Sequence, residues 1–298
     1  MMPAAPRRRG AALGALALIA VVWGYNWVVI KQGLRDAGPY EFFSWRFVIA
    51  SVCLFGALAA TRRPMRLTHA GAVLATGLLQ TTATFALTGW ALVSGAVGKS
   101  AVLCYTMPFW VILFAWPVLG ERLGRAQWIA LATGLAGLVL LLGSGISPGL
   151  SELLALASAV AWAAGIVITK RLQTRHRVDT LALSAWQSVL GGAGLVLLAL
   201  LFPSRPTAWT PGLAFALLYN GVLVSALCWY LWFWVLARLD AGMASFGILA
   251  VPVLGVVFGV LTLGERPRAL EWAGIGLIVV ALALTAIAVR AARPRATA

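Results

Sequence analysis

The chain is a succession of long apolar segments separated by short turns that contain Gly, Pro and charged residues. A helix needs about 20 apolar residues to cross a hydrocarbon core about 30 Å thick, and segments of that length recur along the whole chain. The turn residues divide the sequence into ten predicted membrane-spanning helices, numbered here as spans 1 to 10. Their ranges are residues 11–31, 41–60, 70–92, 96–119, 126–144, 151–170, 180–202, 211–236, 241–263 and 271–290.

Composition agrees with an all-α integral membrane protein. Hydrophobic residues make up 62% of the chain, charged residues only 10%, and the mean hydropathy is +0.94. Soluble domains carry about 25% charged residues, so this chain has too few to cover a water-exposed surface. The first apolar run reaches Ile30 and contains Trp23 and Trp27, which makes it too long and too aromatic for a cleavable signal peptide.

One motif occurs twice, with every matched position 144 residues apart. The matched pairs are Trp90 and Trp234, Pro108 and Pro252, Leu119-Gly120-Glu121-Arg122 and Leu263-Gly264-Glu265-Arg266, and Trp128 and Trp272. The spacing predicts two five-helix repeats, residues 1–145 and 146–298. Because five is odd, the second repeat enters the membrane from the opposite side. Inverted repeats that rock around a midplane site are the architecture of secondary transporters.

The distribution of positive charge predicts the orientation. The two termini and the turns on their side of the membrane carry 16 Lys and Arg residues, and the turns on the opposite side carry six. Cytoplasmic loops hold the excess of basic residues, so both termini are predicted to be cytoplasmic. Anionic headgroups therefore account for the net charge of +15, and no nucleic-acid partner is expected.

The motifs resemble those of the drug/metabolite transporter superfamily, in particular its EamA-type members, over nearly the whole chain. The residues that carry the resemblance are Trp23-Gly24 with Lys31 on span 1, Arg46 on span 2, and Pro108 followed by Gly120-Glu121. The second repeat departs from the pattern at Ala163 and Gln187. The resemblance implies alternating-access export of small metabolites across a bacterial inner membrane, with aromatic and neutral amino acids as the nearest substrate type. It also implies that spans 1–4 and 6–9 enclose the pathway while spans 5 and 10 support it from outside.

Polar and aromatic side chains inside the apolar spans are the candidates for a substrate cavity, because buried polar groups need partners that a substrate can supply. These candidates are Tyr25, Asn26, Gln80, Thr84, Tyr105, Trp162, Trp229 and Tyr230. Each can instead form interhelical hydrogen bonds, which average about 0.6 kcal/mol in membranes. A cationic drug or a nucleoside-like metabolite is an alternative substrate for the same aromatic cavity.

Two prolines and three cations are candidates for moving parts. Pro108 and Pro252 fall near the middle of spans 4 and 9, where proline kinks or breaks a helix and frees a carbonyl, so each is a candidate hinge or else a static kink. Lys31, Arg46 and Lys99 are candidates for an external gate or vestibule.

Lys31 and its counterpart Lys170 lie at span ends, and for both the favoured interpretation is a side chain that snorkels to the headgroups. Arg46 lies about five residues inside span 2 and is expected to face the bundle or its external vestibule, with Glu41 as a candidate partner nearby.

The remaining chemistry narrows the function. All eight carboxylates fall in turns or at span ends, which favours a facilitator or exchanger over proton coupling. There is no His-Glu-x-x-His pair and no phosphate-binding loop, so the sequence predicts no metal, no cofactor and no enzymatic activity. A membrane enzyme would need clustered acids and bases, and a channel would need a symmetric pore. The expected partners are a small-molecule substrate and the bilayer, and a monomer is compatible with one chain that holds both repeats.

Overall fold

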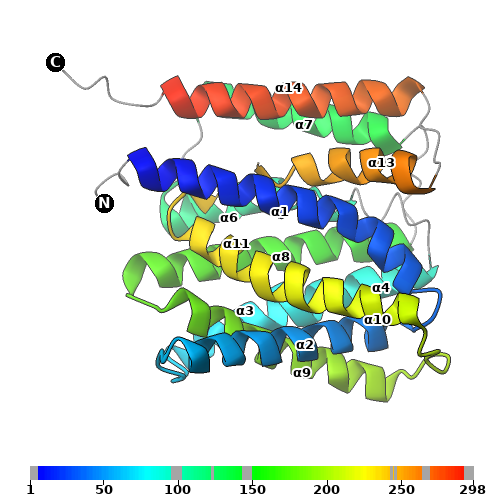
Figure 1. Cartoon of the computed structure of the whole chain (residues 1–298). Helices are drawn as coiled ribbons and strands as arrows, with labels where there is room; N and C mark the ends of the chain where they lie inside the picture. Colours follow the sequence, from blue (N-terminus) through cyan, green and yellow to red (C-terminus); the bar gives the residue numbers. More distant parts are fainter. Residues whose placement is uncertain are drawn as a thin grey trace.

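The computed structural model describes residues 6–94, 103–121, 124–142, 150–241, 244, 247–263 and 269–291, and this described part contains helices and turns but no strand (Figure 1). The first half holds α1 (Pro6–Gly33), α2 (Pro39–Ala60), α3 (Ala70–Gly77), the π-helical η1 (Leu78–Ala83), α4 (Thr84–Ser94), α6 (Met107–Leu119) and α7 (Arg125–Leu142). The second half holds α8 (Leu150–Arg175), α9 (Thr180–Leu201), α10 (Pro211–Leu218), the π-helical η2 (Tyr219–Cys228), α11 (Trp229–Leu236), α13 (Ala250–Leu263) and α14 (Ala269–Ala291).

Six helical segments are long and apolar enough to cross a membrane. They are Gly10–Gly33, Pro39–Ala60, Ala70–Ala91, Leu153–Arg175, Thr180–Leu201 and Pro211–Leu236, which confirms spans 1, 2, 3, 6, 7 and 8 as helices of that length. Shorter apolar helices occupy Met107–Leu119, Arg125–Leu140, Ala250–Thr262 and Trp272–Leu284, so spans 4, 5, 9 and 10 stay predictions. Large apolar side chains such as Val52, Leu200 and Leu261 point outward, as on a surface that lipid covers.

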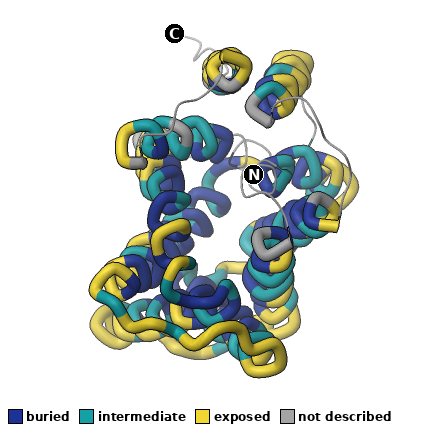
Figure 2. Tube along the Cα trace, turned by 90° about the vertical axis from the view of Figure 1, so that its right-hand side faces the viewer, coloured by how far each residue is buried: buried dark blue, intermediate teal, exposed yellow. Residues whose placement is uncertain are grey.

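The helices form one bundle with a separate pair at its edge. α7 and α14 pack against each other along one side (Figure 1), whereas α1 packs on α13, α2 on α9, and α8 on both α4 and α6. A Cβ added to Gly137 of α7 would lie 2.7 Å from the Gly274 carbonyl oxygen of α14, so glycine permits this close approach. Viewed along the helices, buried positions line the inside of the bundle and exposed positions its outside (Figure 2).

Both prolines of the duplicated motif lie in the first turn of a helix. A turn at residues 105–106 precedes α6, so span 4 is interrupted next to Pro108 and is not continuous. Residues 248–249 form the corresponding turn before α13, which contains Pro252 as its third residue. The first turn of a helix suits proline, because the amide that proline lacks would have no intrahelical acceptor there. Whether either turn moves as a hinge stays a prediction.

Two π-helical segments, η1 and η2, interrupt the third and eighth predicted spans, and hydrophobic periodicity gives no sign of them. π-helical turns widen the backbone and occur frequently at functional sites. The hydroxyl of Thr84 donates to the carbonyl oxygen of Leu79 in η1 at 2.7 Å. Ser225 belongs to η2.

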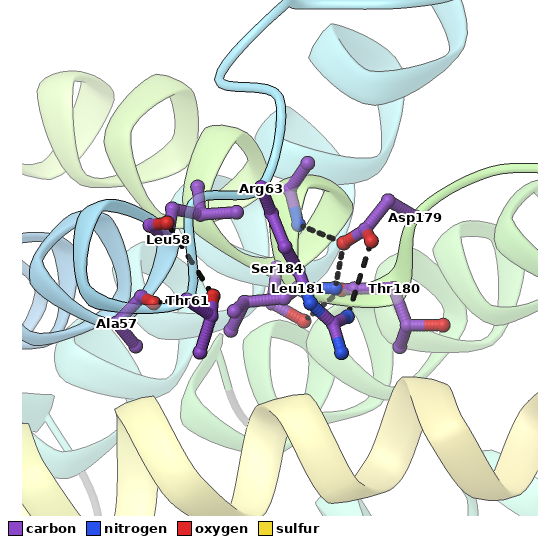
Figure 3. A network of polar contacts seen from close by, with 9 residues as sticks. Ala57, Leu58, Thr61, Arg63, Asp179, Thr180, Leu181 and Ser184 are labelled. Atoms are coloured by element: carbon purple, nitrogen blue, oxygen red, sulfur yellow. Dashed lines mark hydrogen bonds and ion pairs between the residues drawn. The ribbon is translucent and has the colours of Figure 1, made fainter.

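Polar contacts tie the helix ends together at one face of the bundle (Figure 3). Asp179 accepts hydrogen bonds from the amides of Leu181 and Ala182 and thereby caps α9. Its other carboxylate oxygen lies 3.1 Å from Arg63, which follows α2. At the other ends of these helices Thr210 donates to Asp36 at 2.5 Å, and Ser204 donates to Glu41 through its amide and its hydroxyl.

Candidate functional site

A cavity of about 80 Å³ lies between α1, α2, α4, α8, η2 and α11, beside the turn that precedes α6. Its lining consists of Trp23, Asn26, Trp27, Ile30, Phe43, Arg46, Thr84, Phe85, Thr88, Cys104, Tyr105, Ser158, Trp162, Val224 and Trp229. Pockets for drug-sized ligands begin at about 300 Å³. In this conformation the cavity therefore admits very small molecules, and a larger solute requires its walls to separate.

One wall of the cavity is made of tryptophans from three helices. The Trp23 ring centroid lies 5.8 Å from that of Trp162 and 6.0 Å from that of Trp229. These tilted contacts fall within the range at which aromatic pairs attract each other. The indole Nε1 atoms of all three residues are buried and donate no hydrogen bond within the described part of the chain. The wall therefore offers both aromatic faces and unused donors to a solute.

Arg46 supplies a positive charge to the cavity. Its side chain is 2% exposed, and its Nε donates to the Ser225 hydroxyl of η2. The guanidinium carbon lies 4.5 Å from the ring centroid of Phe85, a cation–π contact that holds the group in place. Its Nη1 is buried and has no hydrogen-bond partner among the described residues. Arg46 therefore presents a donor that a negatively charged group can use.

The expected pairing of Arg46 with Glu41 is not found. Glu41 instead accepts hydrogen bonds from Ser204, in the turn before α10. Glu41 lies in the first turn of α2, more than one helical turn before Arg46, and its carboxylate bonds the backbone amide and hydroxyl that approach it there. No Asp or Glu is among the described residues that line the cavity.

Smaller polar groups complete the lining. Asn26 is 7% exposed and its Oδ1 has no donor among the described residues. Tyr105 accepts a hydrogen bond from the Trp27 indole at 2.9 Å. The Thr88 hydroxyl lies 3.1 Å from the Ser158 hydroxyl, and this pair joins α4 to α8. The lining thus combines an unused acceptor at Asn26 with the unused donor at Arg46.

The structure brings most of the sequence-predicted cavity residues together, but not all of them. Asn26, Thr84, Tyr105, Trp162 and Trp229 line the cavity, as does the predicted vestibule residue Arg46. Tyr25, Gln80 and Tyr230 lie elsewhere. Adjacent helical residues point about 100° apart, which separates Tyr25 from Asn26 and Tyr230 from Trp229.

The three residues outside the lining each have other neighbours. The Tyr25 ring packs against the rings of Tyr219 and Phe258 at 5.6 and 5.3 Å. Gln80 is fully buried against Gly165 of α8, and Tyr230 packs on the apolar cluster between α2 and α9.

Several lining residues were absent from the sequence-based set, notably Trp23, Thr88 and Ser158. The sequence contains a signal for two of them, Trp23 and Thr88. Trp23 holds the same place in the first repeat as Trp162 in the second, eight residues before a lysine. Thr88 follows Thr84 by four residues and so shares its helix face. Ser158 sits in an alanine-rich stretch and carries no comparable signal.

The two lysines that were expected to snorkel differ. Lys31 is exposed in the last turn of α1, as a snorkelling side chain would be. Lys170 is only 4% exposed, and its Nζ donates to the carbonyl oxygens of Leu236 and Leu239 at 2.6 and 2.5 Å. Carbonyls at the end of a helix lack intrahelical partners. The carbonyls at and just after the end of α11 therefore accept hydrogen bonds from the Lys170 ammonium group, which keeps this side chain buried. The third predicted gate residue, Lys99, lies outside the described residues.

The other groove and the metal-ligating residue types provide no second candidate site among the described residues. An open groove of about 550 Å³ beside α6 and α8 has an apolar lining apart from Arg171, Arg175 and His176 at one end, and it contains none of the candidate cavity residues. Among the described residues there is no group of three His, Cys, Asp or Glu that could hold a metal ion. The three cysteines are free thiols, and one of them, Cys104, lines the cavity.

Known proteins resemble this chain in sequence and fold. Residues 10–143 and 149–287 match the EamA-like transporter family. The chain is 31% identical over 256 residues to the uncharacterized transporter YoaV of Bacillus subtilis (strain 168), covering 83% of this chain and 87% of the relative. It is 26% identical over 296 residues to a probable amino-acid metabolite efflux pump of Escherichia coli (strain K12), covering 93% and 95%. A crystal structure superposes with a TM-score of 0.81 at 23% identity over 96% of this chain and 99% of that one, which shows a shared fold.

Proposed function

Because this chain belongs to the EamA-like transporter family, we propose that it exports amino acids with aromatic or neutral side chains across a bacterial inner membrane. It is a multi-pass membrane protein, and transport proceeds in this proposal by alternating access to the cavity. The probable amino-acid metabolite efflux pumps among its relatives support a substrate of this kind. The observation that carries the proposal is that Arg46 lines an aromatic cavity while its Nη1 has no hydrogen-bond partner among the described residues.

The proposed topology has ten spans in two inverted five-helix repeats, residues 1–145 and 146–298, with both termini in the cytoplasm. Its support is the constant offset of 144 residues in the duplicated motif, together with separate family matches to residues 10–143 and 149–287. The turns before α6 and α13 lie at equivalent places in the two halves, beside Pro108 and Pro252. In this proposal they serve as the hinges.

Arg46 selects the carboxylate of the substrate. A buried cation without an ionic partner is costly, and an incoming carboxylate offsets that cost by accepting charge-assisted hydrogen bonds. The guanidinium keeps its position through Ser225 and Phe85 while Nη1 remains open. A cationic drug would meet the same charge as repulsion, so the geometry favours an amino acid over that alternative.

The rest of an amino acid finds matching groups. An ammonium group can donate to Oδ1 of Asn26 and lie against the tryptophan faces. A neutral or aromatic side chain can pack on the wall formed by Trp23, Trp162 and Trp229. A nucleoside-like metabolite could use the same wall by stacking, but it lacks the carboxylate that Arg46 calls for unless it carries another anionic group.

Coupling to protons receives no support from the cavity, since none of its described lining residues is an Asp or Glu. The proposal is therefore a facilitator or exchanger that moves its substrate down a gradient, without a cofactor and without catalysis. Acidification or alkalinisation that depends on substrate in sealed vesicles would contradict this part of the proposal.

The test is uptake of radiolabelled amino acids by liposomes that contain the purified protein, with and without a pH gradient. Phenylalanine and tryptophan should enter with saturable kinetics that do not respond to the gradient. Phenylalaninamide, which keeps the ring and the amine but lacks the carboxylate, is the matched control and should enter no faster than into protein-free liposomes. Equal transport of acid and amide would remove the role assigned to Arg46, and no transport of any amino acid would overturn the substrate class.

A further inference from the structure

We propose that Lys170 and Glu121 form a latch that closes the end of the transport pathway at which both residues lie. The latch consists of these two side chains and the segment Leu236–Ala241, which follows the last turn of α11. The inference rests on the alternating-access part of the proposed function and does not depend on which substrate is carried.

Lys170 holds the end of α11 through backbone carbonyls. Its ammonium group donates to Leu236 and Leu239, residues that are 66 and 69 positions away in the sequence. Gln173, on the same helix, donates to the carbonyl oxygen of Phe233 at 2.9 Å. α8 is therefore attached by side-chain hydrogen bonds to two carbonyls of α11, those of Phe233 and Leu236, and to one carbonyl in the turn that follows, that of Leu239.

Glu121 attaches a third segment to the same place. It follows the end of α6, and its Oε1 accepts a hydrogen bond from the Ala241 amide at 3.1 Å. The negative charges of Glu121 and Asp240 attract the Lys170 ammonium group. The cation and the carboxylate thus bond different residues of one short segment, and that segment links the end of α6 to α8 and α11.

The latch is placed where it can control access. Trp162 of α8 lines the cavity, and Lys170 follows it by eight residues, or about 12 Å along the helix. Trp229 of α11 lines the cavity seven residues before the bonded carbonyl of Leu236. Tyr105 lines it just before α6, which runs to the Glu121 end. The latch therefore joins the ends of α8 and α11, whose other parts line the cavity, to the end of α6, which begins beside the cavity.

The chemistry of the latch suits reversible closure. Hydrogen bonds between charged side chains and backbone groups can be exchanged for hydrogen bonds to water at little net free energy when a helix end becomes hydrated. A purely apolar contact would instead expose surface to water on opening. A charge-based seal can thus close the pathway and still open.

The experiment measures access to Cys104, a natural thiol in the cavity, in a protein whose Cys53 and Cys228 are replaced by Ala. Membrane vesicles of both orientations receive the anionic, membrane-impermeant reagent 2-sulfonatoethyl methanethiosulfonate, and the modification rate is measured. A separate Thr174→Cys protein lacking all three native cysteines identifies the vesicle orientation that exposes the Lys170 end, because Thr174 is exposed on α8.

Lys170→Met and Glu121→Ala should each raise the rate from the Lys170 end roughly tenfold, because an open state that is a minor population becomes a major one. The rate from the opposite end should fall. Glu121→Gln keeps an oxygen that can accept from Ala241 but loses the charge, so its increase should be smaller. Lys31→Met is the matched control at the equivalent position of the first repeat, and Arg175→Gln removes an exposed cation from the same helix. Neither control should raise the rate from the Lys170 end.

Unchanged rates in both Lys170→Met and Glu121→Ala, in proteins that elute as the parent does in gel filtration, would overturn the latch. An equal increase in Lys31→Met would also overturn it, because the effect would then not belong to this end. If Lys170→Met does not fold, the graded pair Glu121→Ala and Glu121→Gln decides alone. Failure of amino-acid transport in liposomes would leave these labelling rates as they are, so the two proposals fail separately.

Discussion

Arg46 and Lys170 are two buried cations that the fold treats in opposite ways. They are 2% and 4% exposed, and both lie on helices of membrane-spanning length. Arg46 lines the cavity and donates to Ser225, while its Nη1 has no hydrogen-bond partner in the described part of the chain. Lys170 bonds two carbonyls, is attracted by two carboxylates and does not line the cavity. The two cations thus differ in whether the described residues use their hydrogen-bonding capacity and in whether they line the cavity, and not in how deeply they are buried.

Among the variants that test this contrast, Arg46→Met is expected to have the largest effect on uptake. Losing a buried charge that pairs with a substrate carboxylate costs about 2–5 kcal/mol, so kcat/KM for phenylalanine uptake should fall roughly 30-fold or more. The melting temperature in detergent should not fall, since a buried charge without an ionic partner gives way to an apolar side chain. Uptake at the parental rate would place the substrate carboxylate elsewhere.

Lys170→Met should have the opposite signature in a stability measurement. The variant leaves the Leu236 and Leu239 carbonyls without their donor, which should cost about 1–3 kcal/mol and lower the melting temperature in detergent. Arg175→Met, the removal of an exposed cation from the same helix, serves as the control and should change the melting temperature little. Equal stability of the two variants would mean that the Lys170 hydrogen bonds contribute nothing to the fold.

A smaller effect is expected at the tryptophan wall. Trp162→Ala removes aromatic contacts with Trp23 and Trp229 and should reduce uptake of aromatic amino acids about 2- to 12-fold, equivalent to 0.5–1.5 kcal/mol. Uptake of alanine should change less, because the methyl side chain of this substrate makes few contacts with the tryptophan rings. Trp128→Ala, an exposed position on α7, is the control in the same assay. Similar losses in both Trp variants would argue against a substrate-facing wall.

The smallest effect is expected for a third cation, Arg63, which pairs with Asp179 at the surface. The two side chains are 45% and 33% exposed, and exposed ion pairs contribute about 0.2–1 kcal/mol. Arg63→Gln should therefore shift the melting temperature little and leave uptake unchanged at physiological salt. A loss as large as that of Lys170→Met would show that the end of α2 depends on this pair more than its exposure implies.

Sequence reasoning located the helices more reliably than it located the side chains on them. Apolar length and turn residues predicted helices such as 180–202, where α9 spans Thr180–Leu201. The side of a helix that faces a cavity depends on how its neighbours pack, so Asn26 and Tyr25 could not be told apart as adjacent polar residues. The π-helical segments add to this problem, because they shift the helix phase without a signal in the apolar pattern.

The position of Lys170 shows a second limit. A lysine at the end of a span ordinarily extends to the headgroups, and for Lys31 an exposed side chain agrees with that expectation. For Lys170 the carbonyls at the end of α11 provide a better destination. That destination exists only when residues 66 positions apart meet in the folded chain, which no local pattern encodes.

The α7–α14 pair has a consequence for how the molecule is made. Synthesis proceeds from the N-terminus, and 126 residues lie between the end of α7 at Leu142 and the start of α14 at Ala269. At translation rates of about 5–20 residues per second, α14 is synthesised roughly 6 to 25 s after α7. Until then the face of α7 that Gly137 presents to Gly274 has no α14 to pack against. The sequence of α7 suits such an interval, because its one charged residue, Arg125, stands at its very beginning.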